Sequence, residues 1–374
     1  MPFICLLFLL VSNAVAAQTY YLFVGSYNFS KEKEGIYVYK FDIESGRLKK
    51  MYSTHDVANP SYLTLSPNGK YVYACTETQT KNAGSMSSFR FDSVHCVLSF
   101  INKQLSGGEN PVYNAVDKTG RWLVNANYTE GGVSVYALDS DGNIQPPPQT
   151  IQFSEGSVNK ERQERAHVHS TVFSPDGDFL FLPDLGADKI RCYSFGAAKS
   201  TPLTEYATTR SVPGSGPRHF TFHPNGKFAY CIEEMAGFVT AYSYNNGRLD
   251  SFQRIAAHPR HHKDNFNSAD IHMSPDGRFL YASNRSEENN IAIFSIDQGT
   301  GILKLVGYQS TLGDHPRNFT IDPTGKFLLV ANQISGNVVV FKRNISTGML
   351  VYTGIQIKIP GASCLQIRKY SDRK

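Results

Sequence analysis

Three observations predict that this chain folds as an all-β ring of repeated sheets. A turn built around glycine recurs six times, strands are expected on both sides of each turn, and Tyr, Phe and Val are plentiful whereas Met and Trp are scarce. The turn glycines are separated by 48 to 57 residues and are Gly69, Gly120, Gly177, Gly226, Gly277 and Gly325. Four short strands in each period of about fifty residues are typical of a β-propeller blade. The sequence therefore predicts a β-propeller.

The two ends of the chain together supply one further blade. Strands are expected at residues 20–26, 35–42 and 48–53, which is one strand short of a blade, and a lone strand is expected at 362–368. If the carboxy-terminal strand completes the amino-terminal blade, the ring closes and no sheet edge is left open. The expected fold is a seven-bladed β-propeller that occupies residues 18–374 as one domain, because repetition accounts for the length.

Residues 1–17 differ from the repeats. An apolar run from Phe3 to Val11 is too short to span a bilayer, and the small residues from Ala14 to Ala17 are typical of a signal-peptide cleavage site. We therefore predict a secretory signal peptide at residues 1–17 and an exported protein, periplasmic or secreted. The alternative is a buried amino terminus, which would leave the protein in the cytoplasm.

Composition and charge argue against several classes of partner. The net charge is only +5 and the Lys and Arg residues are scattered, so we predict neither nucleic acid nor a membrane as partner. Five cysteines follow the signal sequence without a CxxC motif, and we expect them to be buried free thiols. His258, His261 and His262 lie among Arg260 and Lys263, which favours a solvated loop over a metal patch. We expect a monomer with no metal and no cofactor.

The repeat register places particular side chains at one mouth of the central channel. In each blade the strand before the turn and the strand after it are antiparallel, so the start of the first lies beside the end of the second. The positions eight residues before the glycine are Ser61, Val112, His169, Arg218, Ala269 and Arg317. The positions eight residues after it are Glu77, Tyr128, Leu185, Glu234, Arg285 and Gln333. The positions seven residues after it are Thr76, Asn127, Asp184, Glu233, Asn284 and Asn332.

Side chains of different chemistry at equivalent positions of the repeat indicate a composite site. In this site the cationic side chains outnumber the anionic ones. Arg218, Arg285 and Arg317 outnumber Glu77 and Glu234 at the expected mouth. Guanidinium groups suit carboxylates and phosphates, so we predict a small anionic molecule as the ligand.

A histidine and a glutamate beside these arginines can activate water. His167 and His169 are two residues apart and share one face of a strand. In this interpretation one of them, or Glu234, acts as general base, while Arg218 and Arg285 stabilise a developing oxyanion. The further substrate-binding candidates are Arg317, Gln333, Asn332, Glu77 and Asp184.

Several neighbouring residues have a structural interpretation instead. His219 follows Arg218 and is expected to point the opposite way, and Asp270 with His272 is expected to form an inter-blade pair. The charged insertion at 155–165 is interpreted either as a partial lid over the mouth or as a surface loop.

A specific set of motifs extends over about residues 20–368. It comprises Gln163-x-x-x-His167-x-His169, Pro183-Asp-Leu-Gly186, Gly214-Ser-Gly-Pro-Arg-His219, the segment from Ser274 to Arg285, and His315-Pro-Arg317. This set resembles the seven-bladed lactonase family. The resemblance implies metal-free lactone chemistry at the channel mouth, and the family's implicated residues fall on His169 or His167, Arg218, Glu234 and Arg285. Where relatives often have Asn-Glu, this chain has Glu233-Glu234, and the register favours Glu234.

The activity that this resemblance implies is hydrolysis of an anionic sugar lactone. A 6-phosphogluconolactonase of this type converts 6-phospho-D-glucono-1,5-lactone to 6-phosphogluconate in the pentose phosphate pathway of glucose metabolism. The first alternative is a muconate-type cycloisomerase resembling the carboxymuconate lactonizing enzyme. The second is a non-catalytic propeller that binds a small molecule or a protein, because a fold alone does not fix function.

Overall fold

The computed structural model describes residues 18–30, 32–55, 57–78, 83–259 and 266–371. These residues form strands, turns and bends, without a helix among them. Accordingly, the described part of the chain holds no helix with the length and apolarity that a membrane crossing requires. The predicted signal peptide at residues 1–17 lies outside the described residues.

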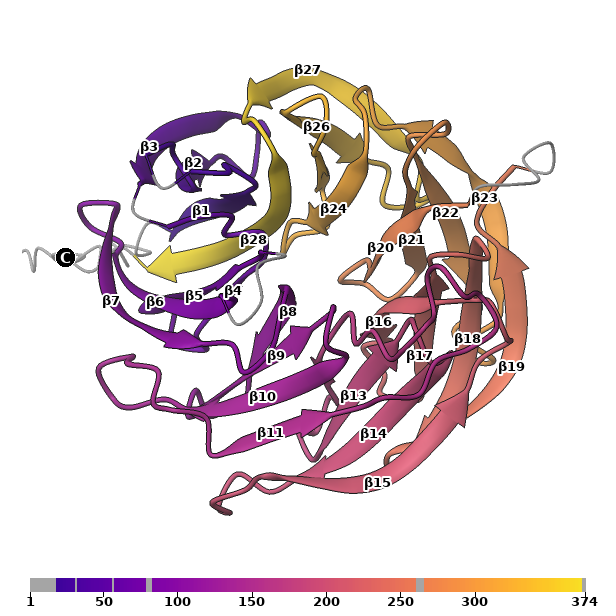
Figure 1. Cartoon of the computed structure of the whole chain (residues 1–374). Helices are drawn as coiled ribbons and strands as arrows, with labels where there is room; N and C mark the ends of the chain where they lie inside the picture. The colour runs from indigo at the N-terminus through magenta and orange to yellow at the C-terminus, as the bar shows by residue number, and fades with distance from the viewer. Residues whose placement is uncertain (1–17, 31, 56, 79–82, 260–265, 372–374) are drawn as a thin grey trace, which may run out of the picture.

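The strands form seven four-stranded antiparallel sheets arranged in a ring (Figure 1). The first sheet, from its inner to its outer strand, contains β28 (Ala362–Ser371), β1 (Gln18–Ser26), β2 (Ile36–Phe41) and β3 (Leu48–Thr54). The next three sheets contain β4 (Leu63–Leu65), β5 (Tyr71–Thr76), β6 (Ser85–Asp92) and β7 (Val97–Leu105); β8 (Pro111–Val116), β9 (Trp122–Asn127), β10 (Gly132–Ala137) and β11 (Gln149–Gln152); and β12 (Val172–Phe173), β13 (Phe179–Asp184), β14 (Lys189–Phe195) and β15 (Leu203–Arg210). The last three contain β16 (Pro217–Phe222), β17 (Phe228–Glu233), β18 (Phe238–Asn245) and β19 (Arg248–Ala256); β20 (Ser268–Met273), β21 (Phe279–Asn284), β22 (Asn290–Ile296) and β23 (Leu303–Ser310); and β24 (Pro316–Ile321), β25 (Phe327–Asn332), β26 (Asn337–Arg343) and β27 (Leu350–Lys358).

The prediction of a seven-bladed propeller closed by the carboxy-terminal strand is confirmed. Strand β28 pairs antiparallel with β1 along its whole length, from Gln18 opposite Ser371 to Ser26 opposite Ala362. The two strands lie side by side although they come from opposite ends of the chain (Figure 1). Behind the junction, Phe41 of the first blade packs edge to face on Phe327 of the last, with 5.9 Å between ring centroids. Closure therefore buries apolar surface as well as a sheet edge.

The repeated turns explain why the blades share one geometry. All six turn glycines have a positive φ, between 68° and 77°, which a side chain would strain. In the turn after β4, the Ser66 hydroxyl bonds the Asn68 side chain and accepts the backbone N–H of Tyr71. Ser174 and Ser274 make the equivalent bonds to Asp176 and Asp276. The Ser-Pro-x-Gly sequence thus starts the second strand of a blade in a fixed register.

Four of the inner strands, β8, β16, β20 and β24, carry a β-bulge close to their first residue. In β16, Pro217 pairs with Glu233 and His219 with Ile232, so Arg218 is the extra residue. Strands β8, β20 and β24 show the same shift close to their first residue. A bulge changes the direction of the side chains around it and is common next to active sites.

The predictions for the cysteines and for the histidine-rich loop have different outcomes. All five cysteines after residue 17 are free and buried, as predicted. The interpretation of the histidine-rich loop as solvated is wrong for His258, which is 5% exposed and bonds Glu288 and Ser268. These two polar partners satisfy the imidazole of His258, as the burial of a polar ring requires. His261 and His262 lie outside the described residues.

Candidate active site

A backbone hydrogen bond that recurs in each of the six repeats confirms the register from which the mouth was predicted. In each of the six repeats, the residue eight positions after the turn glycine donates its N–H to the carbonyl ten positions before that glycine. The donor and acceptor pairs are Glu77 and Asn59, Tyr128 and Asn110, Leu185 and His167, Glu234 and Gly216, Arg285 and Asn267, and Gln333 and His315. The start of every inner strand therefore lies beside the end of the second strand.

Glu234 is the centre of the cluster at this mouth. Its Oε2 lies 2.8 Å from Nε of Arg218 and 3.0 Å from Nη2 of Arg285. Its Oε1 lies 2.6 Å from Nη2 of Arg162, which belongs to the charged insertion. Arg218 also donates to the backbone oxygen of Ala269 at 2.6 Å. Two different acceptors therefore fix the plane of this guanidinium group.

Burial and charge set the ionisation of this cluster. Arg218 is 1% exposed and Glu234 is 5% exposed. Burial favours the neutral form of Glu234, but Arg285, Arg218 and Arg162 outweigh it and hold the pKa of its carboxyl far below the usual range. Burial and the neighbouring arginines lower the pKa of Arg218 to about 9, so the group stays charged at neutral pH. Glu234 is therefore a permanent anion of low basicity.

Glu77 and Arg317 extend the cluster on the side of the first blade. Nη2 of Arg317 lies 3.5 Å from Oε2 of Glu77, and its guanidinium carbon lies 5.3 Å from the centre of the Tyr27 ring. The Tyr27 hydroxyl donates to Glu77. Nε2 of His315 lies 3.5 Å from Nη1 of Arg285. Burial and these arginines lower the pKa of His315 to about 3, so its imidazole is neutral at neutral pH.

The cluster carries an excess of positive charge. Its ionised side chains are those of Arg162, Arg218, Arg285 and Arg317 against those of Glu77 and Glu234. Four guanidinium groups thus face two carboxylates, and the excess favours a small anion with carboxylate or phosphate groups.

The two histidines that open the predicted motif have different surroundings. His167 is fully engaged: Nδ1 lies 2.8 Å from the Tyr128 carbonyl, Nε2 lies 3.2 Å from Glu164, and the ring stacks on Tyr128 at 4.5 Å. His169 is 5% exposed, and within the described residues its imidazole makes no hydrogen bond to another residue. Burial, then Arg218, His219 and Arg317, lower the pKa of His169 well below its usual value. His169 is therefore a neutral imidazole with a free nitrogen beside the arginines.

The positions seven residues after the turn glycine lie inside the blades instead. Asp184 is fully buried, and its carboxylate binds Arg191 at 3.0 Å and accepts the backbone N–H of His167. Asn332 is fully buried and donates to the Thr311 carbonyl. Successive strand residues point to opposite faces, so these two side chains turn away from the mouth. The Asp184 carboxylate is engaged within its blade, and Oδ1 of Asn332 is buried although it has no hydrogen-bond partner among the described residues, so we propose no substrate contact for either.

The same alternation separates the two adjacent glutamates. Glu233 is 1% exposed and pairs with Arg254 of the same blade at 2.6 Å. Glu234, one residue later, joins Arg218 and Arg285. Gln333 occupies the equivalent position in the last blade, and its Oε1 is buried without a hydrogen-bond partner among the described residues.

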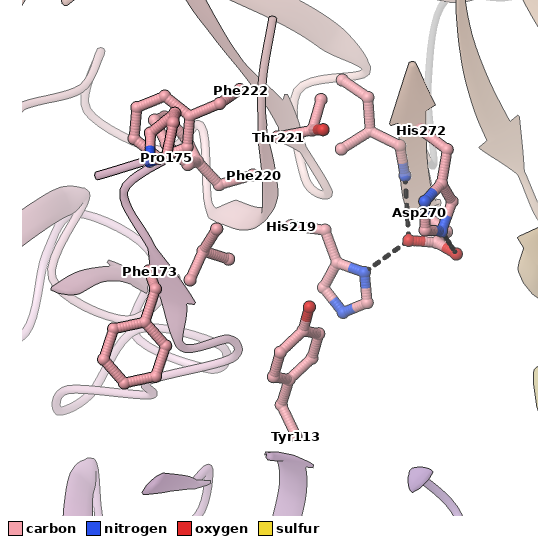
Figure 2. A pocket seen from close by; sticks show the side chains of 11 residues that line it. Tyr113, Phe173, Pro175, His219, Phe220, Thr221, Phe222, Asp270 and His272 are labelled. Atoms are coloured by element: carbon pink, nitrogen blue, oxygen red, sulfur yellow. Dashed lines mark hydrogen bonds and ion pairs between the residues drawn. The ribbon is translucent and has the colours of Figure 1, made fainter. Parts of the chain in front are cut away.

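A chain of polar contacts leads from Arg218 to His219 and Asp270, and Figure 2 shows its His219, Asp270 and His272 part. Nη1 of Arg218 lies 3.1 Å from Nε2 of His219, whose Nδ1 lies 2.7 Å from Asp270. Asp270 contacts His272 at 2.9 Å and accepts bonds from the Asn318 side chain of the next blade. The expectation that His219 points away from Arg218 is wrong, because the bulge at Arg218 interrupts the alternation.

Asp270 and His272 were expected to form a pair that connects neighbouring blades, and the structure shows a different arrangement. They pair within β20, and Asp270 hydrogen-bonds to both neighbouring blades, through His219 and Asn318, whereas the His272 ring packs on Phe319 of one of them. A pocket of about 290 Å³ opens beside them, between Tyr113, Phe220 and His272 (Figure 2). It lies on the inner-strand side toward the turns, away from Glu234.

Three residues of the cluster were missed by sequence reasoning. Arg162 belongs to an irregular insertion that has no repeat register, and its only signal was the position of that charged run immediately before His167. His315 was visible in the His315-Pro-Arg317 motif but had no assigned position. Tyr27 comes from the first blade, which lacks a turn glycine, so nothing in the sequence placed it beside Glu77.

No group of three or more histidine, cysteine, aspartate or glutamate side chains in the described ranges is arranged to hold a metal ion. The fold and the cluster define a propeller with an arginine-rich site for a small anion and a neutral histidine beside it. The chain belongs to the seven-bladed β-propeller lactonase family, whose model, described as "Lactonase, 7-bladed beta-propeller", matches residues 21–367.

Individual relatives agree with this assignment. The chain is 43% identical to a 6-phosphogluconolactonase of Formosa agariphila over 94% of its own length and 100% of the relative's. It is 34% identical to the 6-phosphogluconolactonase of Bacillus subtilis, with 92% and 97% covered. Its structure is similar to that of the periplasmic gluconolactonase of Pseudomonas aeruginosa, with a TM-score of 0.88, 35% identity, and 93% and 99% of the two chains covered.

Proposed function

We propose that this protein hydrolyses the ester bond of an anionic sugar 1,5-lactone, with 6-phospho-D-glucono-1,5-lactone as the first candidate substrate. The observation that carries the proposal is the excess of guanidinium groups around Glu234 and Glu77, next to the imidazole of His169, whose Nδ1 has no hydrogen-bond partner among the described residues. The names of the two relatives and the structural neighbour support the same reaction class.

In this mechanism arginine binds the anionic group of the substrate and the carbonyl oxygen of the lactone. Arg218 and Arg285 are candidates for the oxyanion, because both are buried and held by Glu234 before substrate arrives. Arg317 and Arg162 are candidates for the anionic substituent. Glu77 and Gln333 border this part of the site and orient the substrate.

Proton transfer is assigned to His169. Its neutral imidazole accepts a proton from the water that adds to the carbonyl carbon, and the ring C–O bond of the tetrahedral intermediate then breaks. The departing ring oxygen takes the proton from the imidazolium. Because burial, and after it Arg218 and Arg317, disfavour that imidazolium, it is a strong acid toward the leaving oxygen. Glu234 stays ionised and positions the arginines, and His167 supports the Tyr128 side of the site.

Steady-state hydrolysis of 6-phosphogluconolactone and of glucono-1,5-lactone tests the proposal. We expect catalysis above the spontaneous rate, and a loss of kcat/KM of about 100-fold or more in Arg218→Ala and in His169→Gln. Arg121→Ala is the matched control, because this arginine is exposed at the turn before β9. Rates equal to spontaneous hydrolysis on both lactones would refute the lactonase activity, and conversion of a carboxymuconate instead would favour the cycloisomerase.

The cellular context belongs to this proposal as well. Export is supported by the apolar run and small residues in positions 1–17 and by the similarity to the periplasmic gluconolactonase. A place in the pentose phosphate pathway would instead need a cytoplasmic protein. Fractionation of cells that express the full chain, followed by amino-terminal sequencing of the mature protein, distinguishes the two.

A further inference from the structure

A second pocket opens on the same face as the cluster and shares a wall with it. Its volume is about 680 Å³, within the roughly 300–1,000 Å³ of small-molecule sites. It is lined by the loop after β1, the ends of β3 and β25, and the residues before β28, all of which lie at the mouth. Tyr27 is the shared wall, because its ring lines the pocket and its hydroxyl reaches Glu77.

Phe29 forms an unusual aromatic surface in this pocket. Phe29 is 79% exposed, and its ring stacks on that of Tyr27, with 6.1 Å between centroids and 27° between planes. Its backbone has a φ of 55°, a region that a bulky residue seldom adopts. Both the exposure and the backbone conformation are unfavourable for the isolated protein. Such combinations are concentrated at ligand sites, where binding covers the ring.

Hydrogen bonds hold this conformation in place and connect it to the cluster. The N–H of Phe29 donates to Oδ1 of Asn59 at 2.8 Å, and the N–H of Asn59 donates to Oδ1 of Asn28 at 2.7 Å. The Asn59 amide donates to the Glu77 carbonyl at 3.1 Å. The aromatic pair is therefore fixed relative to the end of β5, where the catalytic cluster begins.

The rest of the pocket combines apolar and hydrogen-bonding groups. Ile334 is 65% exposed on the opposite side of the pocket. Next to it stands Gln333, with its unpartnered Oε1. Lys33 is exposed and makes no ion pair with a described residue. A pyranose ring matches this combination, because its C–H face stacks on an aromatic ring while its hydroxyls bond amides and ammonium groups.

We propose that the pocket between Phe29 and Ile334 is a subsite for a second sugar ring attached to the lactone. The proposal rests on the proposed lactonase activity and extends its substrate class to the 1,5-lactones of disaccharide aldonic acids. The reacting lactone lies among Arg218, Arg285 and His169, and the attached glycosyl unit passes Tyr27 into the subsite.

Kinetics on matched lactones test the subsite. The substrates are glucono-1,5-lactone, maltobiono-1,5-lactone and cellobiono-1,5-lactone, and the readout is the ratio of kcat/KM between each disaccharide lactone and the monosaccharide lactone. We expect wild-type protein to prefer at least one disaccharide lactone about tenfold. Phe29→Ala and Ile334→Ser should bring that ratio close to one. Phe100→Ala is the matched control, because Phe100 is 56% exposed on an outer strand, and it should leave the ratio unchanged.

Binding of the products separates this proposal from the activity on which it rests. Calorimetry with maltobionate, cellobionate and gluconate should show tighter binding of a disaccharide acid to wild-type protein and no such preference in Phe29→Ala. A ratio near one in wild-type kinetics, or an equal ratio in wild type and Phe29→Ala, overturns the subsite while the lactonase activity stands. A preference for δ-decanolactone over the sugar lactones overturns the assignment to sugar. Absence of any lactone hydrolysis refutes the proposed function itself.

Discussion

The carboxylate of Glu234 forms ion pairs with three guanidinium groups, and two of them, those of Arg218 and Arg285, are buried with it. Replacing it by the isosteric amide in Glu234→Gln leaves Arg218 and Arg285 buried without an anionic partner. Removing one partner of a buried ion pair costs about 3–5 kcal/mol. With an unfolding entropy of about 2.1 cal/mol/K per residue over 374 residues, this loss corresponds to a decrease of about 4–6 °C in Tm.

The pH dependence of this loss follows from the direction of the pKa shift. The pKa of Glu234 is lower in the folded protein than in the unfolded chain, because its three arginines outweigh burial. Its stabilisation is therefore complete above the unfolded value of roughly 4.3 and is lost only as the pH falls through the depressed folded pKa. The difference in the free energy of unfolding between wild type and Glu234→Gln should be constant from pH 5 to 8 and should decrease at lower pH.

Urea unfolding and thermal melting at pH 7 measure the effect. Glu44→Gln is the matched control, because Glu44 is 74% exposed in an ion pair with Lys326 and should change stability by less than about 1 kcal/mol. If Glu234→Gln unfolds within about 1 kcal/mol of wild type, the three guanidinium groups are not held by Glu234 and the account of the cluster is wrong.

Four further predictions concern separate features. Because the neutral form of His169 is stabilised, kcat/KM for glucono-1,5-lactone should stay flat well below pH 6.5; an acid limb near pH 6.5 would contradict the assignment of the base. Arg162→Ala should raise KM about tenfold with less than a threefold change in kcat, and an effect on kcat alone would place Arg162 outside substrate binding. Asp270→Asn should destabilise the protein by about 3 kcal/mol in urea unfolding. Since Asp270 raises the pKa of His272 despite burial, this loss should be largest between about pH 4 and 6.5 and should narrow as the pH rises past the His272 pKa. A reducing agent should leave Tm unchanged, because all five described cysteines are free.

Most of the fold and part of the site could be predicted because the chain repeats. Each turn glycine marks a register, and counting from it brought His169, Arg218 and Glu234 to one mouth without any knowledge of tertiary contacts. The closing strand was equally predictable, because three amino-terminal strands and one carboxy-terminal strand complete a single blade.

The errors arise where the repeat stops being regular. The prediction for His219 assumed that side chains alternate strictly between the two faces of a strand. The bulge at Arg218 interrupts this alternation and brings His219 toward the same channel. Position eight after the glycine brings Glu234 to Arg218 and Arg285, whereas the position-seven side chains of Asp184 and Asn332 are buried inside their blades. Counting from the glycine could not distinguish these two positions. Arg162 has no repeat partner, so only the folded insertion shows that it reaches Glu234.

The union of β1 with β28 has a consequence for how the protein must fold. The Ser363 hydroxyl donates to the Gly25 carbonyl across 338 positions of the chain. Among the described strands β1 is synthesised first and β28 last, so the first blade lacks its inner strand until β28 has been made. Contacts of such long range slow folding and expose strand edges meanwhile. Ring closure therefore cannot precede the synthesis of β28, and this strand is the last element that the propeller needs.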